Sequence, residues 1–339
     1  MKTWVTIAAA FFSTVLGVPA YAGPTLDAVR TRGELVCGLR GDTMGFARVP
    51  ANGQAAGFEV DLCRAVAIAI LGPQARVKFV PLPAERRLGA VRAGEVDLLV
   101  SGTTVTFGRE TTDGVDFPIV YYFDTQGIMV PRKLNKSRAS DLAGVAICVT
   151  SGTTTERTLA SVMSRLNVKY TAVPARTVEE LRSNFFGGKC GAMTADTSAL
   201  YSTRAAYAAN PEEFVVLRDQ LAQEPLGIGV RSGDREFSNV ARWVVFALLH
   251  AEENRIGMRN AADLRANGTD HVKRFLGGIP GIGKGLGLDD SWAFNVIGTV
   301  GNYGEMFDRN LGPTTPLKVF RGLNVLWSQG GMHYSPAFH

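Results

Sequence analysis

Short apolar strands alternate with amphipathic helices between residues 34 and 195, and the same order of elements occurs twice. In the first unit, apolar residues spaced four apart predict a helix over 58–70, which glycine and proline then end. A strand is predicted at 76–81, a helix at 84–93 and a short buried strand at 96–100. Such alternation is typical of an α/β fold whose largely parallel sheets are covered by helices on both faces.

A second unit repeats this plan. Its predicted strands lie at 145–149, 168–173 and 190–195, and its predicted helices at 153–166 and 177–186. Two similar units in series predict two similar lobes. Because open α/β sheets bind ligands beyond the carboxyl ends of their strands, we expect the lobes to face each other near Gly102 and Asp196.

The chain after the second unit is expected to complete the first lobe. A strand at 226–230 and a long helix at 237–251 are predicted there. Lobe 1 is therefore predicted to comprise 23–126 and 222–339, including a structured C-terminal extension whose pattern indicates no function. Lobe 2 is predicted to comprise 127–221.

The N-terminus has the three parts of a secretory signal peptide over 1–22. Lys2 precedes an apolar run over 5–18, and Ala20-Tyr21-Ala22 places small residues where a signal peptidase reads them. No cysteine stands at the cleavage point, and no later apolar run reaches the roughly 20 residues of a membrane helix. We therefore expect an exported, soluble mature protein that begins at Gly23.

Four cysteines are compatible with folding in an oxidising compartment. They allow three pairings, and the sequence alone does not choose among them. The predicted lobes favour Cys37 with Cys63 and Cys148 with Cys190, each bond stabilising the fold by about 3–4 kcal/mol. The chain has no CxxC motif and no histidine spacing typical of zinc, so no metal is predicted.

Composition and missing motifs narrow the function further. The net charge is only +5 and no run of lysine or arginine stands out, so nucleic-acid binding is not expected. Alternating glycines over 281–287 do not follow a strand within a βαβ unit, which excludes a dinucleotide loop. No phosphate-binding lysine motif and no nucleophile elbow is present. No cofactor is therefore predicted.

A polar run over 103–109 follows the strand at 96–100 and combines three threonine hydroxyls with Arg109. A guanidinium offers a planar, two-pronged donor to a carboxylate, and hydroxyls add single bonds. The same residues would also suit a turn with a surface salt bridge.

Two further positions allow both a binding role and a structural role. Thr153 and Glu156 have the spacing of a capping box at a helix start, where free N–H groups also attract anions. Asp196 ends a predicted strand, so its carboxylate could pair with an ammonium group or cap the next helix, predicted at 197–209.

Taken together, four segments resemble the bacterial family 3 solute-binding proteins: 97–109, 57–62, 151–154 and Asp196. The four cysteines and two stretches of the tail are similar to the subgroup of general L-amino-acid-binding periplasmic proteins. The resemblance implies a two-lobed periplasmic binding protein fold of type II, whose hinged lobes each have a central β-sheet flanked by helices.

The resemblance also implies how the ligand is held. Arg109 would bind the α-carboxylate of an L-amino acid, assisted by Thr104 and by Thr154 from the other lobe. Asp196 and the Gly102 carbonyl would accept bonds from the α-ammonium. A monomeric, non-enzymatic protein of the Gram-negative periplasm would then deliver the ligand to inner-membrane ABC permease subunits and their ATPase.

The chain departs from that family in the loop over 40–46, where Arg40 and Asp42 are charged. These two residues are candidates for ligand specificity. Arg40 would either favour an acidic ligand or remain a solvated loop charge, and we favour the solvated charge. Val105 and Ser101-Gly102 also differ from the usual residues, which argues against broad amino-acid specificity.

Two other functions remain open for such a fold. One is a periplasmic enzyme similar to a dehydratase, for which Glu85, Asp42 and Glu156 are the candidate acids or bases. The other is a sensory protein that presents its ligand to a separate receptor.

Overall fold

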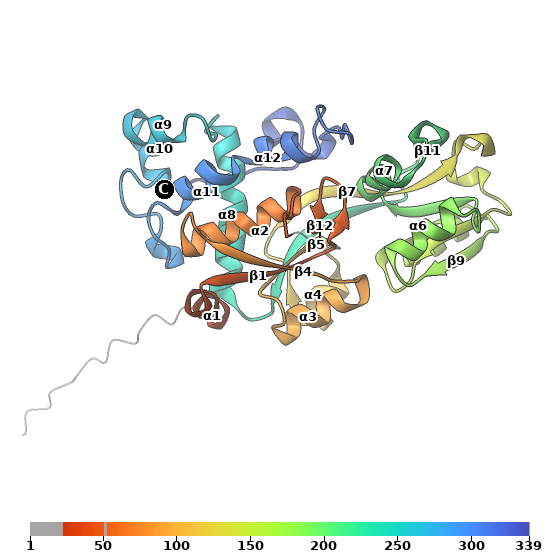
Figure 1. Ribbon diagram of the computed structural model, residues 1–339, viewed down its shortest axis with the longest axis horizontal. Coiled ribbons are helices and arrows are strands. Elements are labelled where there is room, and N and C mark those ends of the chain that lie inside the picture. Colours follow the sequence, from red (N-terminus) through yellow and green to blue (C-terminus); the bar gives the residue numbers. More distant parts are fainter. Residues whose placement is uncertain (1–22, 51–52, 339) are drawn as a thin grey trace, which may run out of the picture.

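The computed structural model describes residues 23–50 and 53–338, which form two lobes side by side (Figure 1). The predicted signal peptide over 1–22 lies outside the described residues. Among those that are described, no helix is long and apolar enough to cross a membrane.

Lobe 1 contains a mixed sheet in the order β4-β1-β5-β12. Strand β1 (Glu34–Leu39) lies parallel to β4 (Arg76–Pro81) and to β5 (Leu98–Thr104). Strand β12 (Ala222–Arg231) pairs antiparallel with β5. The return of the chain to lobe 1 at β12 closes this sheet on the side that faces lobe 2.

Lobe 2 continues the same path of strands in the order β7-β10-β8-β9. Strand β8 (Ala146–Thr150) is parallel to β10 (Ala192–Asp196) and to β9 (Thr171–Ala175). Strand β11 (Phe214–Val216) pairs antiparallel with β7 (Val120–Pro131). The α/β class and the two-lobed fold predicted from the sequence are thus confirmed.

Strands β7 and β12 connect the lobes, as Figure 1 shows near the centre of the molecule. The first half of β7 pairs with β12, and its second half pairs with β10 and β11. These two long antiparallel strands are therefore the connection about which one lobe can rotate relative to the other.

The core of lobe 1 lies between its sheet and a layer of helices. Almost every residue of α2 (Phe58–Leu71) is buried, because the sheet covers one side and the tail helices α11 (Trp292–Val300) and α12 (Tyr303–Asn310) cover the other. Helix α8 (Arg235–Glu253) packs against α2 and α12. The C-terminal extension is thus part of the hydrophobic core of lobe 1.

Lobe 2 has a core on each face of its sheet, because successive strand residues point to opposite faces. Ile147 and Val149 pack with α5 (Thr154–Arg165), whereas Cys148 lies in a second cluster with α6 (Val178–Phe186) and α7 (Thr197–Tyr207). This is the sandwich of helix, sheet and helix that the alternating pattern predicts.

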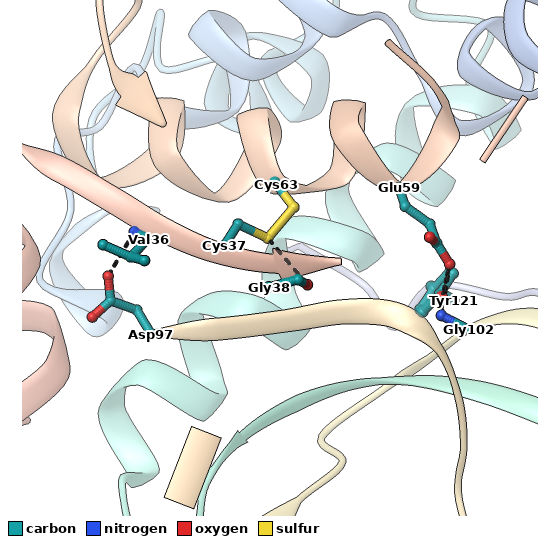
Figure 2. The surroundings of a disulfide bond; sticks show 8 residues. All are labelled: Val36, Cys37, Gly38, Glu59, Cys63, Asp97, Gly102 and Tyr121. Carbon is teal, nitrogen blue, oxygen red and sulfur yellow. Dashed lines mark hydrogen bonds between the residues drawn. A yellow bond between two sulfur atoms is a disulfide. The ribbon is translucent and has the colours of Figure 1, made fainter. Parts of the chain in front are cut away.

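Two disulfides tie helices or loops to these sheets. Cys37 of β1 is bonded to Cys63 of α2 (Figure 2). Cys148 of β8 is bonded to Cys190, which precedes β10. This is the pairing that the predicted lobes favoured. The remaining elements are short: α1 (Pro24–Arg32), α3 (Arg87–Ala93), α4 (Phe107–Thr112), α9 (Ala261–Asn267), α10 (Asp270–Phe275), β2 (Asp42–Thr43), β3 (Ala47–Arg48) and β6 (Val115–Asp116).

Some element boundaries differ from the sequence prediction. Strand β5 continues through residue 104 rather than ending at 100, because β12 pairs with Thr103 and Thr104. Strand β9 begins at 171 rather than 168, since Asn167 has a positive φ of 53° and the Val168 N–H still bonds to the preceding helix. The helix predicted at 84–93 begins with a 3₁₀ turn over Ala84–Arg86.

Candidate functional site

The carboxyl ends of β5 and β10 meet at a cavity of about 800 Å³ between the lobes. All five residues with a predicted ligand-binding role line it, and so does Arg40. The five are Gly102, Thr104, Arg109, Thr154 and Asp196. Asp42 does not line the cavity, although Thr43 does. The cleft thus lies where the strand-end rule places it.

Arg109 lies on α4, directly after the buried strand β5. The Thr106 hydroxyl caps this helix by accepting from the Arg109 N–H at 3.3 Å. The Arg109 guanidinium donates to the Thr104 carbonyl at 2.5 Å, and it has no carboxylate within salt-bridge distance among the described residues. Burial, reinforced by the charge of Arg157, lowers the pKa of Arg109. Arg109 is therefore a half-buried cation without an anion.

Thr104 and Thr154 meet across the cleft with their hydroxyl oxygens 3.5 Å apart. Both donate to the Glu224 carboxylate, Thr154 at 3.4 Å and Thr104 over a shorter distance. Glu224 comes from the connecting strand β12, and burial, together with the charge of Asp196, raises its pKa. The sequence analysis missed Glu224, because the pairing of β12 with lobe 1 rather than a local motif brings it here.

Helix α5 begins at the floor of the cleft on the lobe 2 side. Thr153 accepts from the Glu156 N–H at 3.2 Å, which confirms the predicted N-cap. The Glu156 carboxylate accepts from the Gly152 N–H at 2.8 Å and not from the Thr153 N–H, so only the Thr153 half of the predicted capping box is formed. Thr154 and Thr155 both line the cavity, and N–H groups in the first turn of a helix have no intrahelical partner. This end of α5 therefore favours an anionic group.

The interpretation of Arg40 as a solvated loop charge is wrong. The Arg40 guanidinium donates to the Asp196 carboxylate at 2.6 Å, to the Gly102 carbonyl at 2.8 Å and to the Ser101 carbonyl at 3.2 Å. Its side chain is only 13% exposed. Burial lowers the pKa of Arg40, but the carboxylates of Asp196 and Glu59 outweigh that effect, so its pKa is raised. Arg40 is thus a largely buried cation inside the cleft, paired with Asp196 and bonded to two carbonyls.

Gly102 allows Arg40 to approach the backbone. Its φ is +51°, and a Cβ atom at this position would lie 1.9 Å from the Arg40 Nη2 atom. The Gly102 N–H donates to Glu59 at 2.7 Å and to the Tyr121 hydroxyl at 3.0 Å, as Figure 2 shows. Tyr121 in turn donates to Glu59 at 2.6 Å, and burial raises the pKa of Glu59 despite the opposing charge of Arg40. This buried network holds the Gly102 carbonyl in place.

Asp196 occupies the N-cap position of α7 but accepts no capping hydrogen bond through its side chain. The sequence left open whether its carboxylate pairs with an ammonium group or caps the helix, and in the structure it pairs with a cation of the protein. That cation is Arg40.

Asp42 makes a second ion pair between the lobes. Its carboxylate accepts from Arg182 of α6 at 3.0 Å, and its carbonyl accepts from the Tyr207 hydroxyl at 3.1 Å. The Arg182 guanidinium carbon lies 4.0 Å from the centre of the Tyr207 ring. Asp42 therefore contacts the opposite lobe beside the cavity instead of lining the cavity itself.

Besides Arg182, two further arginines of the cleft were not predicted from the sequence. Arg87 of α3 and Arg157 of α5 line the cavity and have no carboxylate partner in the part of the chain that the structure describes. Burial and the charge of Arg40 lower the pKa of Arg87 to about 10. Only Arg157 carried a local signal, since it lies three residues after Thr154 and so shares a helix face with it.

The candidate acids and bases for an enzyme are placed differently from one another. Asp42 is paired with Arg182, and Glu156 is bonded to the Gly152 N–H. Glu85 lines the cavity and is exposed. The described residues contain no cluster of three or more potential metal ligands.

Comparison with known proteins gives consistent matches. Residues 35–257 match the model of the bacterial extracellular solute-binding proteins, family 3. The chain is 42% identical over 334 residues to the general L-amino acid-binding periplasmic protein AapJ of Rhizobium johnstonii, with 97% of this chain and 98% of that protein covered. The glutamate/glutamine/aspartate/asparagine-binding protein BztA of Rhodobacter capsulatus is also 42% identical over 334 residues, with the same coverage of 97% and 98%.

A solved structure extends this similarity to three dimensions. The periplasmic binding protein of an ABC transporter from Brucella ovis, with glutathione bound, superimposes with a TM-score of 0.90 at 41% identity. The match covers 93% of this chain and 99% of that one.

Proposed function

The chain belongs to the bacterial extracellular solute-binding proteins of family 3, and we propose that it is the periplasmic substrate-binding component of an ABC importer for amino acids or compounds derived from them. The observation that carries this proposal is the half-buried Arg109, which faces the cleft without a carboxylate partner among the described residues. A carboxylate on the ligand would complete this charge pair. Relatives that bind amino acids, and one that binds glutathione, support the same class of ligand.

The carboxylate of the ligand would lie between the Arg109 guanidinium and the start of α5. Thr104 and Thr154 reach this place from opposite lobes. Hydrogen bonds to charged groups contribute about 1.5–3 kcal/mol each, and micromolar affinity corresponds to about 8 kcal/mol. A few such bonds, together with buried apolar area, are enough for micromolar binding after the cost of closing the lobes.

Asp196 and the Gly102 carbonyl are the acceptors to which the sequence assigned the α-ammonium group. In the structure both accept from Arg40. An ammonium group would bind there only by displacing the Arg40 guanidinium. The Asp196 carboxylate and the Gly102 carbonyl suit a cation, whether it is the Arg40 guanidinium or a ligand ammonium group.

We infer that closure of the two lobes selects and retains the ligand. With boundaries at 126/127 and 221/222, the lobes would rotate about β7 and β12, and a ligand that contacts both lobes would stabilise the closed form. The closed monomer, exported to the periplasm by its signal peptide, would dock on inner-membrane permease subunits whose ATPase drives transport. We propose binding alone, without catalysis or a cofactor.

The test is a calorimetric titration of the refolded, ligand-free mature protein. A thermal-shift screen of the twenty L-amino acids and glutathione first identifies a ligand, because a compound that binds only the native state raises the unfolding temperature. The Arg109→Ala variant should then bind it more weakly by at least about 2 kcal/mol, since the carboxylate loses its charged partner.

The matched control is Arg165→Ala, which removes an exposed arginine at the other end of α5. It should bind as the wild type does. A folded Arg109→Ala protein with wild-type affinity would remove the main support for a carboxylate ligand at this position.

A further inference from the structure

Arg40 occupies the cation-binding position that Asp196 and the Gly102 carbonyl form in the cleft. Its guanidinium reaches Asp196 of lobe 2 at 2.6 Å and the Gly102 carbonyl of lobe 1 at 2.8 Å. The Asp196 carboxylate is 9% exposed in this pair. A ligand ammonium group would therefore have to replace a cation that the protein already supplies.

The local backbone is adapted to this guanidinium. Gly102 has no side chain at the point where a Cβ atom would lie 1.9 Å from Arg40, and its N–H is fixed by Glu59 and Tyr121. Arg40 follows β1 directly, whose residue Cys37 is covalently bonded to α2. The strand, the disulfide-bonded helix and the buried hydrogen bonds thus hold Arg40 and Gly102 in fixed positions relative to each other.

The other charges of the cleft leave an excess of cations. The cavity is lined by five arginines, which are Arg40, Arg87, Arg109, Arg157 and Arg182. Among the described residues, three carboxylates line it, which are Glu85, Asp113 and Asp196, while Glu224, which accepts from Thr104 and Thr154, does not line it. Two of these arginines are paired, Arg40 with Asp196 and Arg182 with Asp42.

The three arginines without a carboxylate partner in the described chain approach the cavity from different sides. Arg109 lies on α4 after β5, Arg87 on α3 of the same lobe, and Arg157 one turn into α5 of the opposite lobe. Burial lowers the pKa of Arg109 and the nearby charge of Arg157 lowers it further, so these two form one cationic position and Arg87 forms a second. The two positions can meet two anionic groups of one ligand. A zwitterion with a single carboxylate would leave at least one of these positions unmatched.

From these contacts we propose that Arg40 takes the place of a ligand ammonium group, so that the cleft selects a dicarboxylate whose amino group is absent or acylated. This inference rests on the proposed function, because one carboxylate still binds at Arg109. The second carboxylate binds at Arg87. Arg40 is a specificity-determining residue that excludes free α-amino acids by competing for Asp196.

The experiment compares three probes of the same carbon chain on the full mature protein: L-glutamate, glutarate, which lacks the amino group, and N-acetyl-L-glutamate, in which it is acylated. Affinities are measured by calorimetry for the wild type and for Arg40→Gln and Arg40→Lys. The wild type should bind glutarate or N-acetyl-L-glutamate at least about tenfold more tightly than L-glutamate, a difference of about 1.4 kcal/mol.

Arg40→Gln frees the Asp196 carboxylate and should bind L-glutamate at least about tenfold more tightly than the wild type does. Arg40→Lys keeps a cation and should retain the wild-type preference. Arg48→Gln, at an exposed position on β3, is the matched control and should change nothing. The comparison of probes on the wild type does not depend on how well the Arg40 variants fold.

Each other outcome overturns the inference in a recognisable way. Tighter or equal binding of L-glutamate by the wild type shows that its ammonium group displaces Arg40. If the wild type binds a neutral or basic amino acid but none of the three probes, the proposed function stands and the proposed dicarboxylate ligand is wrong. If no amino acid, peptide or probe binds the refolded wild type, the proposed function fails as well.

Discussion

Among the single residues of the cleft, Gly102 combines a positive φ with close contact to the Arg40 guanidinium. Its positive φ and the adjacent guanidinium leave no space for a side chain. Its N–H and C=O groups are both used, by Glu59 and Tyr121 on one side and by Arg40 on the other. A residue that the sequence analysis proposed only for its carbonyl is therefore a steric determinant as well.

Replacing Gly102 by alanine should destabilise the protein by about 2 kcal/mol or more, because the Cβ atom displaces Arg40 and the left-handed conformation is strained. Urea unfolding measures this change. Gly89→Ala is the control: Gly89 lies in α3 with no atom within 4 Å of its Cβ position, and alanine there should keep or raise stability by about 0.5–1 kcal/mol. Equal stability of Gly102→Ala and the wild type would contradict the close contact.

Asp124 on β7 should make stability depend on pH. Burial and the nearby charge of Asp196 raise the pKa of Asp124 to about 7, and one of its carboxylate oxygens has no hydrogen-bond partner. The folded state then binds more protons than the unfolded state between about pH 4 and 7, so this carboxyl stabilises the fold at low pH and loses that effect as pH rises. The urea midpoint of Asp124→Asn should therefore rise relative to that of the wild type as pH increases, because only the wild type loses stability there. A constant difference across that range would contradict the raised pKa.

Among elements, the tail acts on the connecting strand β7 through one side chain. Asn324 accepts from the Phe123 N–H at 2.7 Å and donates to the Phe123 carbonyl at 2.9 Å, as a neighbouring strand would. The aromatic neighbour His333 lies 5.0 Å from the Phe123 ring. The C-terminal extension is thereby attached to the strand that joins the lobes.

Asn324→Ala should lower the free energy of unfolding by about 1–3 kcal/mol, because two backbone groups of Phe123 lose their partner. Phe320→Ala, which removes a ring that is 90% exposed from the same tail, should change stability by less than about 0.5 kcal/mol. Denaturant unfolding of both variants checks the comparison. A similar loss of unfolding free energy in both variants would mean that the tail stabilises the fold through its packing as a whole and not through the Asn324 hydrogen bonds.

The sequence predicted the elements whose residues follow a local period, and it missed those made by pairing across the chain. The helix at 58–70 and the strand at 76–81 were found because apolar spacing and end signals coincide there. Strand β7 was not predicted: its 12 residues change partners from β12 to β10, and no local period records that exchange.

The same distinction explains which site residues were found. Arg109, Thr154 and Asp196 follow strands or start helices, so a rule about strand ends reaches them. Arg40 was misjudged because its partners Ser101, Gly102 and Asp196 lie 61, 62 and 156 residues away. Long-range contacts of this kind determine whether a charged side chain is solvated or buried. The composition of the loop around Arg40 gives no information about such contacts.

For the whole molecule, two ion pairs span the lobes on either side of Gly41: Arg40 with Asp196, and Asp42 with Arg182. Neighbouring residues of one loop thus contact β10 and α6 of the other lobe. These contacts favour a closed arrangement independently of those that a ligand adds.

Arg182→Ala should shift the molecule toward an open form and weaken ligand binding by about threefold to tenfold, because closure loses the Asp42 pair and the contact with Tyr207. The radius of gyration from small-angle scattering should rise, with unfolding of the lobes little changed. Arg176→Ala, at an exposed position before α6, is the matched control. An unchanged radius and affinity in Arg182→Ala would exclude a role of this pair in closure.

The most direct measurement is a crystal structure of the complex with the tightest ligand found in the screen. We expect a ligand carboxylate bonded to the Arg109 guanidinium at the start of α5, inside the cavity of about 800 Å³ between the lobes. A ligand bound outside this cavity, or one whose carboxylate lies away from Arg109, would contradict it.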